Sequence, residues 1–83
     1  MNVELKGTNP VYMQIREQIE AQIRNKTVGA GESLPSPAAL SQKLSVDRGE
    51  IQRAYFELEQ LSLIKKHTGK DFLGKPRIDY RVA

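Results

Sequence analysis

Arg48 and Gln52 are the two side chains whose types and spacing best suit reading a base pair. They stand four residues apart, so on a helix they would share one face. An arginine can bind guanine O6 and N7 through two hydrogen bonds, and a glutamine can pair with adenine N6 and N7. Two alternatives stay open here: Arg48 pairs with Asp47 or another acid, and Gln52 is an ordinary exposed glutamine.

Positive charge is concentrated at the C-terminal end of the chain. Residues 65–83 contain six lysines and arginines against two aspartates, a net charge of +4, whereas residues 1–41 are neutral and residues 42–64 carry −1. Such a patch attracts polyanions, nucleic acids first. The residues expected to approach phosphate or a minor groove are Lys65, Lys66, His67 and Lys70. The alternative is a solvated basic hairpin.

The remaining residues offer no catalytic or metal-binding chemistry. The chain contains no cysteine and His67 is its only histidine, so neither a thiolate metal site nor a nucleophile–base pair can be assigned. Gly29 and Gly31 lack the following Lys-Ser or Lys-Thr of a phosphate loop. We therefore expect no enzyme activity, no cofactor, no metal and no small-molecule site.

Length and hydropathy predict one small soluble domain. The 83 residues suffice for a single domain with a modest core. The start, MNVELKGTNP, has no apolar run like that of a signal peptide, and no stretch reaches the roughly 18 apolar residues of a membrane span. We expect a cytoplasmic protein without membrane association, found with the nucleoid if it binds DNA.

Apolar periodicity predicts a first helix that ends at about Lys26. Asn9 is its expected cap and Pro10 its first residue, because the N–H that proline lacks would be unpaired there. The apolar residues that recur every four positions are Val11, Ile15, Ile19 and Ile23. This is the pattern of an amphipathic helix with one buried face.

Two further helices follow, separated by a tight turn at Ser45 and Val46. Ser36 is expected to cap the short second helix, with Pro37 at its first position and Leu40 and Leu44 on its apolar face. Asp47 and Glu50 have the spacing of a capping box at the start of the third helix. The expected buried face of that helix consists of Ile51, Ala54, Tyr55, Leu58 and Leu61. Glu57 and Glu59 are expected to be solvated.

The end of the chain predicts a two-stranded hairpin. Leu63 and Ile64 begin an extended segment, and residues 77–82 alternate polar and apolar side chains, which indicates a strand with one buried face. Residues 68–76, with two glycines and a proline, are expected to connect the strands. The plan is a single domain: a polar lead-in at 1–8, a helical core at 10–64 and a basic wing at 65–83.

Several landmarks stand in the register of one known domain. They are Pro10, Tyr12, Gly31, Leu34-Pro35-Ser36, Leu40, Leu44, Val46, Arg48, Arg53, Ala54, Leu58, Glu59 and Leu63-Ile64. The segment 10–72 thereby resembles the N-terminal winged helix-turn-helix domain of the GntR family of bacterial transcription regulators. The resemblance implies a mainly α fold with a small β wing, three helices plus a two-stranded hairpin, whose third helix enters the major groove of double-stranded DNA while the wing contacts the backbone.

The chain departs from this family at positions that would touch DNA. Ala38 stands where the second helix usually has an arginine, and Gln52 replaces another arginine. Gly49 and Glu50 replace two threonines; Gly49 would allow close approach of phosphate, and Glu50 either accepts from cytosine or only caps its helix. The candidate DNA-binding residues are Ser36, Arg48, Gly49, Gln52, Arg53, Lys65, Lys66, His67, Gly69 and Lys70.

Two functions from different classes fit these observations. The first is a sequence-specific DNA-binding transcription regulator. The second is a winged-helix protein-interaction module with weak or lost DNA binding, favoured by the missing arginines and the acids Asp47 and Glu50. Family members normally continue into a second domain that pairs two copies, whereas this sequence stops at Ala83. We therefore expect a weak dimer, or pairing only on DNA, through the first helix and the strand containing Ile78 and Tyr80.

Overall fold

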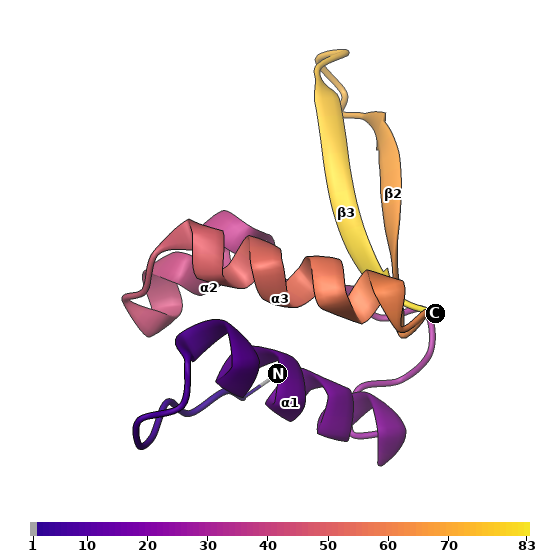
Figure 1. The fold of residues 1–83 in the computed structure, drawn as a ribbon. Helices are drawn as coiled ribbons and strands as arrows, with labels where there is room; N and C mark the ends of the chain where they lie inside the picture. The colour runs from indigo at the N-terminus through magenta and orange to yellow at the C-terminus, as the bar shows by residue number, and fades with distance from the viewer. Residues whose placement is uncertain (1) are drawn as a thin grey trace.

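The computed structural model describes residues 2–83, so the first residue of the predicted lead-in lies outside it. Three helices are followed by a projecting hairpin (Figure 1). The elements are α1 Val11–Arg24, β1 Ser33–Leu34, α2 Pro37–Leu44, α3 Arg48–Gln60, β2 Ile64–Lys70 and β3 Pro76–Val82. The mainly helical winged fold is confirmed. The short strand β1 was not predicted.

The helix starts agree only partly with the predicted caps. Ser36 does cap α2, because its Oγ accepts from the Ala39 N–H at 3.1 Å. Asp47 caps α3 by accepting from the Gly49 N–H at 3.0 Å. The predicted capping box is wrong, however, since the Glu50 side chain does not return to Asp47.

Glu50 instead caps a different helix. Its Oε2 accepts from the Tyr12 N–H at 2.8 Å, in the first turn of α1. The prediction that Asn9 is the N-cap of α1 is wrong, because Pro10 occupies that position and has no side-chain cap. A carboxylate at a helix N-terminus satisfies an unpaired N–H and opposes the positive end of the helix dipole. The acid on α3 therefore fixes the start of α1.

Tyr55 is the centre of the core and joins α3 to two other parts of the fold. Its ring is fully buried with Ile51, Ala54 and Leu58 of the same helix, as predicted. Its hydroxyl donates to the Pro35 carbonyl oxygen at 2.7 Å. Burial raises the pKa of Tyr55 well above its ordinary value. Leu61 was expected in the same buried face but is 46% exposed, because α3 ends one residue before it.

The N-terminal segment packs along α1 rather than leading in loosely. Val3 is buried in the core. Gln14, Gln18 and Gln22 recur every four residues on α1, and their side chains bond the backbone of the segment, including Lys6 N to Gln14 Oε1 at 2.7 Å and Glu4 N to Gln18 Oε1 at 2.8 Å. These amides satisfy backbone groups that a lone extended strand would leave to water.

The sheet has the order β1-β3-β2 with both pairs antiparallel. The β2–β3 ladder runs from Ile64↔Val82 to Lys70↔Pro76, so the connection is shorter than the predicted 68–76. The predicted buried face of β3 holds only at its base: Val82 is buried, whereas Ile78 is 51% exposed. Figure 1 shows why, since α1 covers one side of α3 and the hairpin projects away on the opposite side.

Candidate nucleic-acid interface

Arg48 and Gln52 lie on one open flank of α3, as their spacing predicted. Both are exposed. They line a groove of about 230 Å³ whose other walls come from the start of α2 and from β3. The residues around it are Ser36, Pro37, Ala38, Arg48, Gln52, Ile78 and Tyr80. The structure thus brings Ser36 together with the two base-reading candidates.

Local structure explains how the groove is held open. The Tyr55 hydroxyl fixes the Pro35 carbonyl immediately before the Ser36 cap of α2. The Tyr80 ring packs edge-on against Tyr55, with ring centroids 4.9 Å apart and an interplanar angle of 65°. One buried residue therefore positions two walls of the groove. Ile78 and Tyr80 were not predicted as groove residues, and the polar-apolar alternation of their strand was the one signal that pointed to them.

The acids near Arg48 do not pair with it. Among the described residues 2–83, the ion pairs do not include Arg48, so pairing with Asp47 is not observed. Asp47 accepts from its own helix start and Glu50 from the start of α1. Both carboxylates are thus held by helix N-termini, whose positive partial charge opposes theirs. The repulsion between these two acids and a DNA phosphate, which would weaken DNA binding, is correspondingly reduced.

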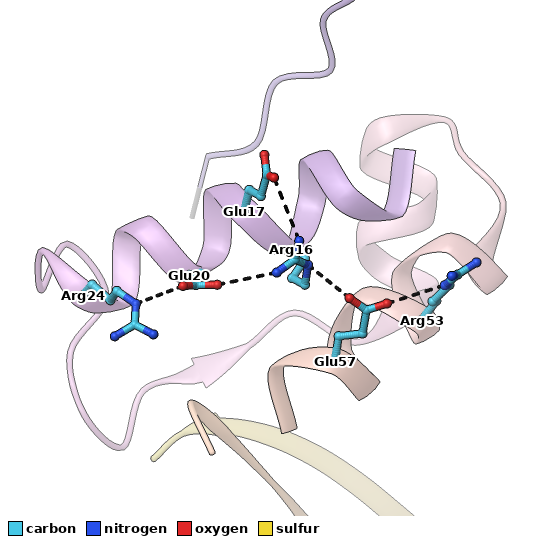
Figure 2. Close-up of polar contacts among 6 residues, drawn as sticks. All are labelled: Arg16, Glu17, Glu20, Arg24, Arg53 and Glu57. Atoms are coloured by element: carbon cyan, nitrogen blue, oxygen red, sulfur yellow. Dashed lines mark hydrogen bonds and ion pairs between the residues drawn. The ribbon is translucent and has the colours of Figure 1, made fainter. Parts of the chain in front are cut away.

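Arg53 lies on the other flank of α3, away from the groove. Its guanidinium carbon is 3.7 Å from the centroid of the Tyr12 ring, and its Nε is 3.5 Å from Glu57 Oε2. Figure 2 shows Glu57 between Arg16 of α1 and Arg53. The structure therefore separates Arg53 from Arg48 and Gln52, although all three were predicted to contact DNA.

Glu57 belongs to a charge network between α1 and α3, so the prediction that it is solvated is wrong. Arg16 lies between its carboxylate, at 3.1 Å from Nε to Oε1, and that of Glu20, at 3.7 Å (Figure 2). Arg24 adds a pair to Glu20 at 3.0 Å. The spacing of Arg16, Glu20 and Arg24 was visible in the sequence, but the cross-helix contact was not.

The wing residues divide between two faces. Successive side chains of a strand point to opposite faces. Lys66 pairs with Tyr80 and Lys70 with Pro76, on the face whose Tyr80 and Ile78 line the groove. Lys65, His67 and Gly69 lie on the opposite face with Arg77, Asp79 and Arg81. The predicted wing set is therefore not one surface.

The opposite face of the wing carries its own ion pairs. Asp79 lies 3.3 Å from Arg77 and 3.8 Å from Arg81, measured from carboxylate oxygen to guanidinium nitrogen. Gly69 and Gly49 are both exposed. A Cβ on Gly49 would meet Asp47 Oδ1 at 3.7 Å, an ordinary contact, and one on Gly69 would meet nothing within 4 Å. The fold itself does not require glycine at either position.

The described residues form neither a metal-binding cluster nor a membrane-spanning helix. Within residues 2–83, no three His, Asp or Glu side chains gather where they could hold a metal ion. None of the described helices has the length and apolar character needed to cross a membrane.

Similar proteins of known sequence include two regulators of Bacillus subtilis. The HTH-type transcriptional regulator YhcF is 30% identical over 70 residues, which cover 84% of this chain and 58% of YhcF. The HTH-type transcriptional repressor NagR is 28% identical over 80 residues, covering 95% of this chain and 33% of NagR. The chain therefore spans between a third and somewhat over half of the length of these relatives.

Solved structures with the same fold include other regulators. YtrA from Sulfolobus acidocaldarius, a GntR-family transcription factor, matches with a TM-score of 0.78 and 26% identity, over 98% of this chain and 77% of YtrA. A GntR family transcriptional regulator from Listeria monocytogenes matches with a TM-score of 0.72 and 33% identity, over 94% and 62%. The AraR DNA-binding domain, solved with operator ORR3, shares the fold at a TM-score of 0.69 and 22% identity, over 100% and 90%.

The family assignment rests on the helices and the first strand of the hairpin together. A family model described as bacterial regulatory proteins, gntR family, matches residues 11–73, which include all three helices, β2 and the start of the hairpin tip. This stretch contains Arg48, Gln52 and Ser36 of the groove. The chain belongs to the gntR family of bacterial regulatory proteins.

Proposed function

We propose that this chain is the DNA-binding module of a sequence-specific transcription regulator, with α3 in the major groove and the wing on the backbone. The observation that carries this proposal is the open groove in which Arg48 and Gln52 stand beside the Ser36 end of α2. The family membership and the regulator relatives support it. So does the fold shared with the AraR domain, which was solved with its operator.

Each groove residue has a chemical role under this proposal. Arg48, in the first turn of α3, donates to guanine, and Gln52, one turn later, pairs with adenine. Ser36 and the first N–H groups of α2 bind a backbone phosphate, because a helix N-terminus favours an anion. Lys66 and Lys70, on the groove side of the wing, contact phosphates and add affinity without sequence information.

The direct test is selection of duplexes from a random library, followed by gel shifts at low and moderate salt. We expect enrichment of a defined sequence, tight binding to it and a steep decrease of affinity with salt. Arg48→Ala provides the matched comparison within α3, and Gln60→Ala, an exposed polar residue at the C-terminal end of the same helix, provides the control. Absence of any binding at micromolar protein would contradict the proposal.

A protein-interaction module is the second candidate function. Phe56 favours it, because this large apolar side chain is 59% exposed on α3. Exposed aromatic residues are enriched at protein interfaces. The interaction module predicts failure of the gel shift together with a loss of partner binding in Phe56→Ser.

We also propose that two copies pair, but not through β3, the strand predicted from the sequence. The predicted contact strand, β3, is the central strand of the sheet at Tyr80 and Arg81, because β1 and β2 flank it there. The edge strands are β1, which is only two residues long, and β2, whose lysines oppose edge-to-edge association. Pairing is therefore more favourable on DNA, where two half-sites bring two copies together. Sedimentation with and without an inverted-repeat duplex tests this; one copy per duplex on an asymmetric site would contradict it.

The proposed activity also implies where in the cell the protein works and that it needs no catalytic group. A DNA-binding regulator works in the cytoplasm at the nucleoid and needs no catalytic group. Fractionation of cells that express the tagged chain, with nuclease treatment of the pellet, would test this location.

A further inference from the structure

The tip of the wing presents two large apolar side chains to solvent. Phe72 is 95% exposed and Leu73 is 65% exposed. They lie between β2 and β3, at the end of the hairpin that projects farthest from the helices (Figure 1). Residues of a hairpin turn are normally small or polar. Burial in the core does not account for two apolar residues here.

The turn beneath them is held by its own hydrogen bonds. The Asp71 carbonyl oxygen accepts from the Gly74 N–H at 2.9 Å, which closes a four-residue turn with Phe72 and Leu73 at its centre. Asp71 Oδ1 accepts from the N–H groups of Leu73 and Lys75 at 2.9 and 3.0 Å. Gly74 has the positive φ of 80° that glycine adopts without strain. The two apolar side chains are thus carried on an ordered turn.

Positive charge surrounds the apolar pair. Lys70 and Lys75 flank the turn and are exposed, and Arg77, also exposed, lies beyond Lys75 with its charge paired to Asp79. Asp71, the acid within the turn, is engaged by the two backbone N–H groups of the turn. An apolar point flanked by two lysines matches a partner with a negatively charged surface and an apolar interior, as a stacked duplex has between its phosphate strands.

The reach of the wing fits the adjacent groove of the same duplex. Ile78 lines the groove beside Arg48, and β3 continues from it for two residues to Pro76, about 7 Å, before the turn that carries Phe72 and Leu73. Centres of neighbouring major and minor grooves are about half a helical turn apart, roughly 17 Å. With Arg48 in the major groove, the turn and its two apolar side chains must span the remaining distance to enter the neighbouring minor groove.

We propose that Phe72 and Leu73 form an apolar wedge that enters the minor groove, partly unstacks one base step and bends the duplex. This inference rests on the proposed DNA-binding function and adds a mechanical role to it. Proteins that insert apolar wedges from the minor groove bend DNA by roughly 20–90°. Base steps that unstack easily, such as TA and CA, are favoured at the wedge position, so the tip contributes sequence preference without hydrogen bonds to bases.

The experiment uses the full chain and a duplex selected by that chain from a random library. Affinity is measured by fluorescence anisotropy, bending by energy transfer between dyes at the duplex ends, and unstacking by 2-aminopurine placed at successive steps. The test variant is Phe72→Ser/Leu73→Ser. Phe72→Met preserves an apolar tip. Leu61→Ser removes an exposed apolar side chain at the end of α3 and serves as the matched control.

The wedge predicts a specific set of results. The double variant loses affinity on the order of tenfold or more, and both the energy transfer and the 2-aminopurine signal return to those of free duplex. Phe72→Met retains most of the bend, and Leu61→Ser behaves as wild type. Because the tip is exposed, circular dichroism should show the same thermal midpoint for wild type and tip variants.

Each contrary result has a separate meaning. If the wild-type chain selects no duplex, the proposed function fails and the wedge with it. If it binds tightly but the tip variants bind and bend DNA equally, the wedge is wrong and the function stands. Loss of affinity without bending or unstacking would make the tip a surface contact only. Tip-dependent binding to phosphatidylserine vesicles, with DNA binding unchanged, would assign the tip to a membrane surface and overturn the wedge.

Discussion

Helix α3 has two flanks with opposite character. On one flank, Arg48 and Gln52 face an open groove. On the other, Glu50 bonds the Tyr12 N–H, while Arg53 and Glu57 are held against α1 (Figure 2). We call these the open flank and the closed flank. Each flank carries an arginine, and that of the closed flank, Arg53, stacks on Tyr12 and pairs with Glu57, whereas Arg48 lines the groove.

Helical geometry explains the difference. Arg48 and Arg53 are five residues apart, which places them about 140° apart around the helix. The closed flank therefore orients α3 against α1, and the open flank is presented in a fixed direction as a result. The same residue type is held by the protein on one side and lines an open groove on the other.

The largest expected effect comes from breaking the open flank. Arg48→Ala should cost about 1–3 kcal/mol of binding free energy on the selected site and relax preference for one base pair. Unfolding stability should stay within about 0.5 kcal/mol, as for exposed positions. Anisotropy titrations on the selected duplex and on single-base variants measure this. An equal loss on every sequence would make Arg48 a phosphate contact instead.

The next effect comes from the closed flank. Glu50→Ala leaves the Tyr12 N–H without its acceptor and removes a charge from the α1 N-terminus, so it should lower unfolding stability by about 1–2 kcal/mol. Glu50→Gln keeps an acceptor and should lose less. Urea denaturation measures both. A loss of DNA affinity larger than that of Arg48→Ala would contradict the assignment of Glu50 to the closed flank.

Tyr55 holds two walls of the groove on the open flank and predicts a pH dependence. Burial raises its pKa in the folded state, so its contribution to stability is present below the unfolded value of about 10 and is lost as pH rises above it. Tyr55→Phe removes the bond to Pro35, which should cost about 1 kcal/mol at neutral pH. Above pH 10 its unfolding stability should fall less steeply than that of wild type. Parallel slopes would contradict this origin.

The two faces of the wing differ in the same way as the two flanks of α3. Lys66 and Lys70 lie on the face that continues the open flank, and Lys65 lies on the reverse. Lys66→Ala/Lys70→Ala should lower the slope of log affinity against log salt by about one unit for each phosphate that the variant no longer binds. Lys65→Ala should leave the slope unchanged. Equal effects of all three substitutions would show that both faces of the wing reach DNA.

The sequence could predict what depends on one helix or strand at a time. The Ser36 cap, the buried residues around Tyr55 and the shared face of Arg48 and Gln52 all follow from spacing within one helix. Contacts between elements did not follow. Glu50 has the spacing of a capping box, but Tyr12, distant in sequence, supplies a better-placed donor.

The same limit applies to the remaining site residues. Arg53 is an exposed arginine by pattern, and only the packing of α1 places the Tyr12 ring beneath it. The two faces of the wing need the strand register, which pattern alone left open because the connection was predicted too long. The family resemblance identified Arg53 as an arginine that contacts DNA, but it gave no information about the residues that surround Arg53 in this fold.

The smallest effect should come from Arg53, and it separates the flanks most cleanly. Its guanidinium stacks on Tyr12 and pairs with Glu57, both at the protein surface, so Arg53→Ala should cost about 0.5–1 kcal/mol of unfolding stability. A double-mutant cycle with Tyr12→Leu, measured by urea denaturation, should assign most of that loss to the pair. DNA affinity should change far less than in Arg48→Ala. If Arg53→Ala weakens DNA binding strongly while the cycle shows no coupling to Tyr12, Arg53 leaves α1 to bind DNA, and the closed flank is not closed in the complex.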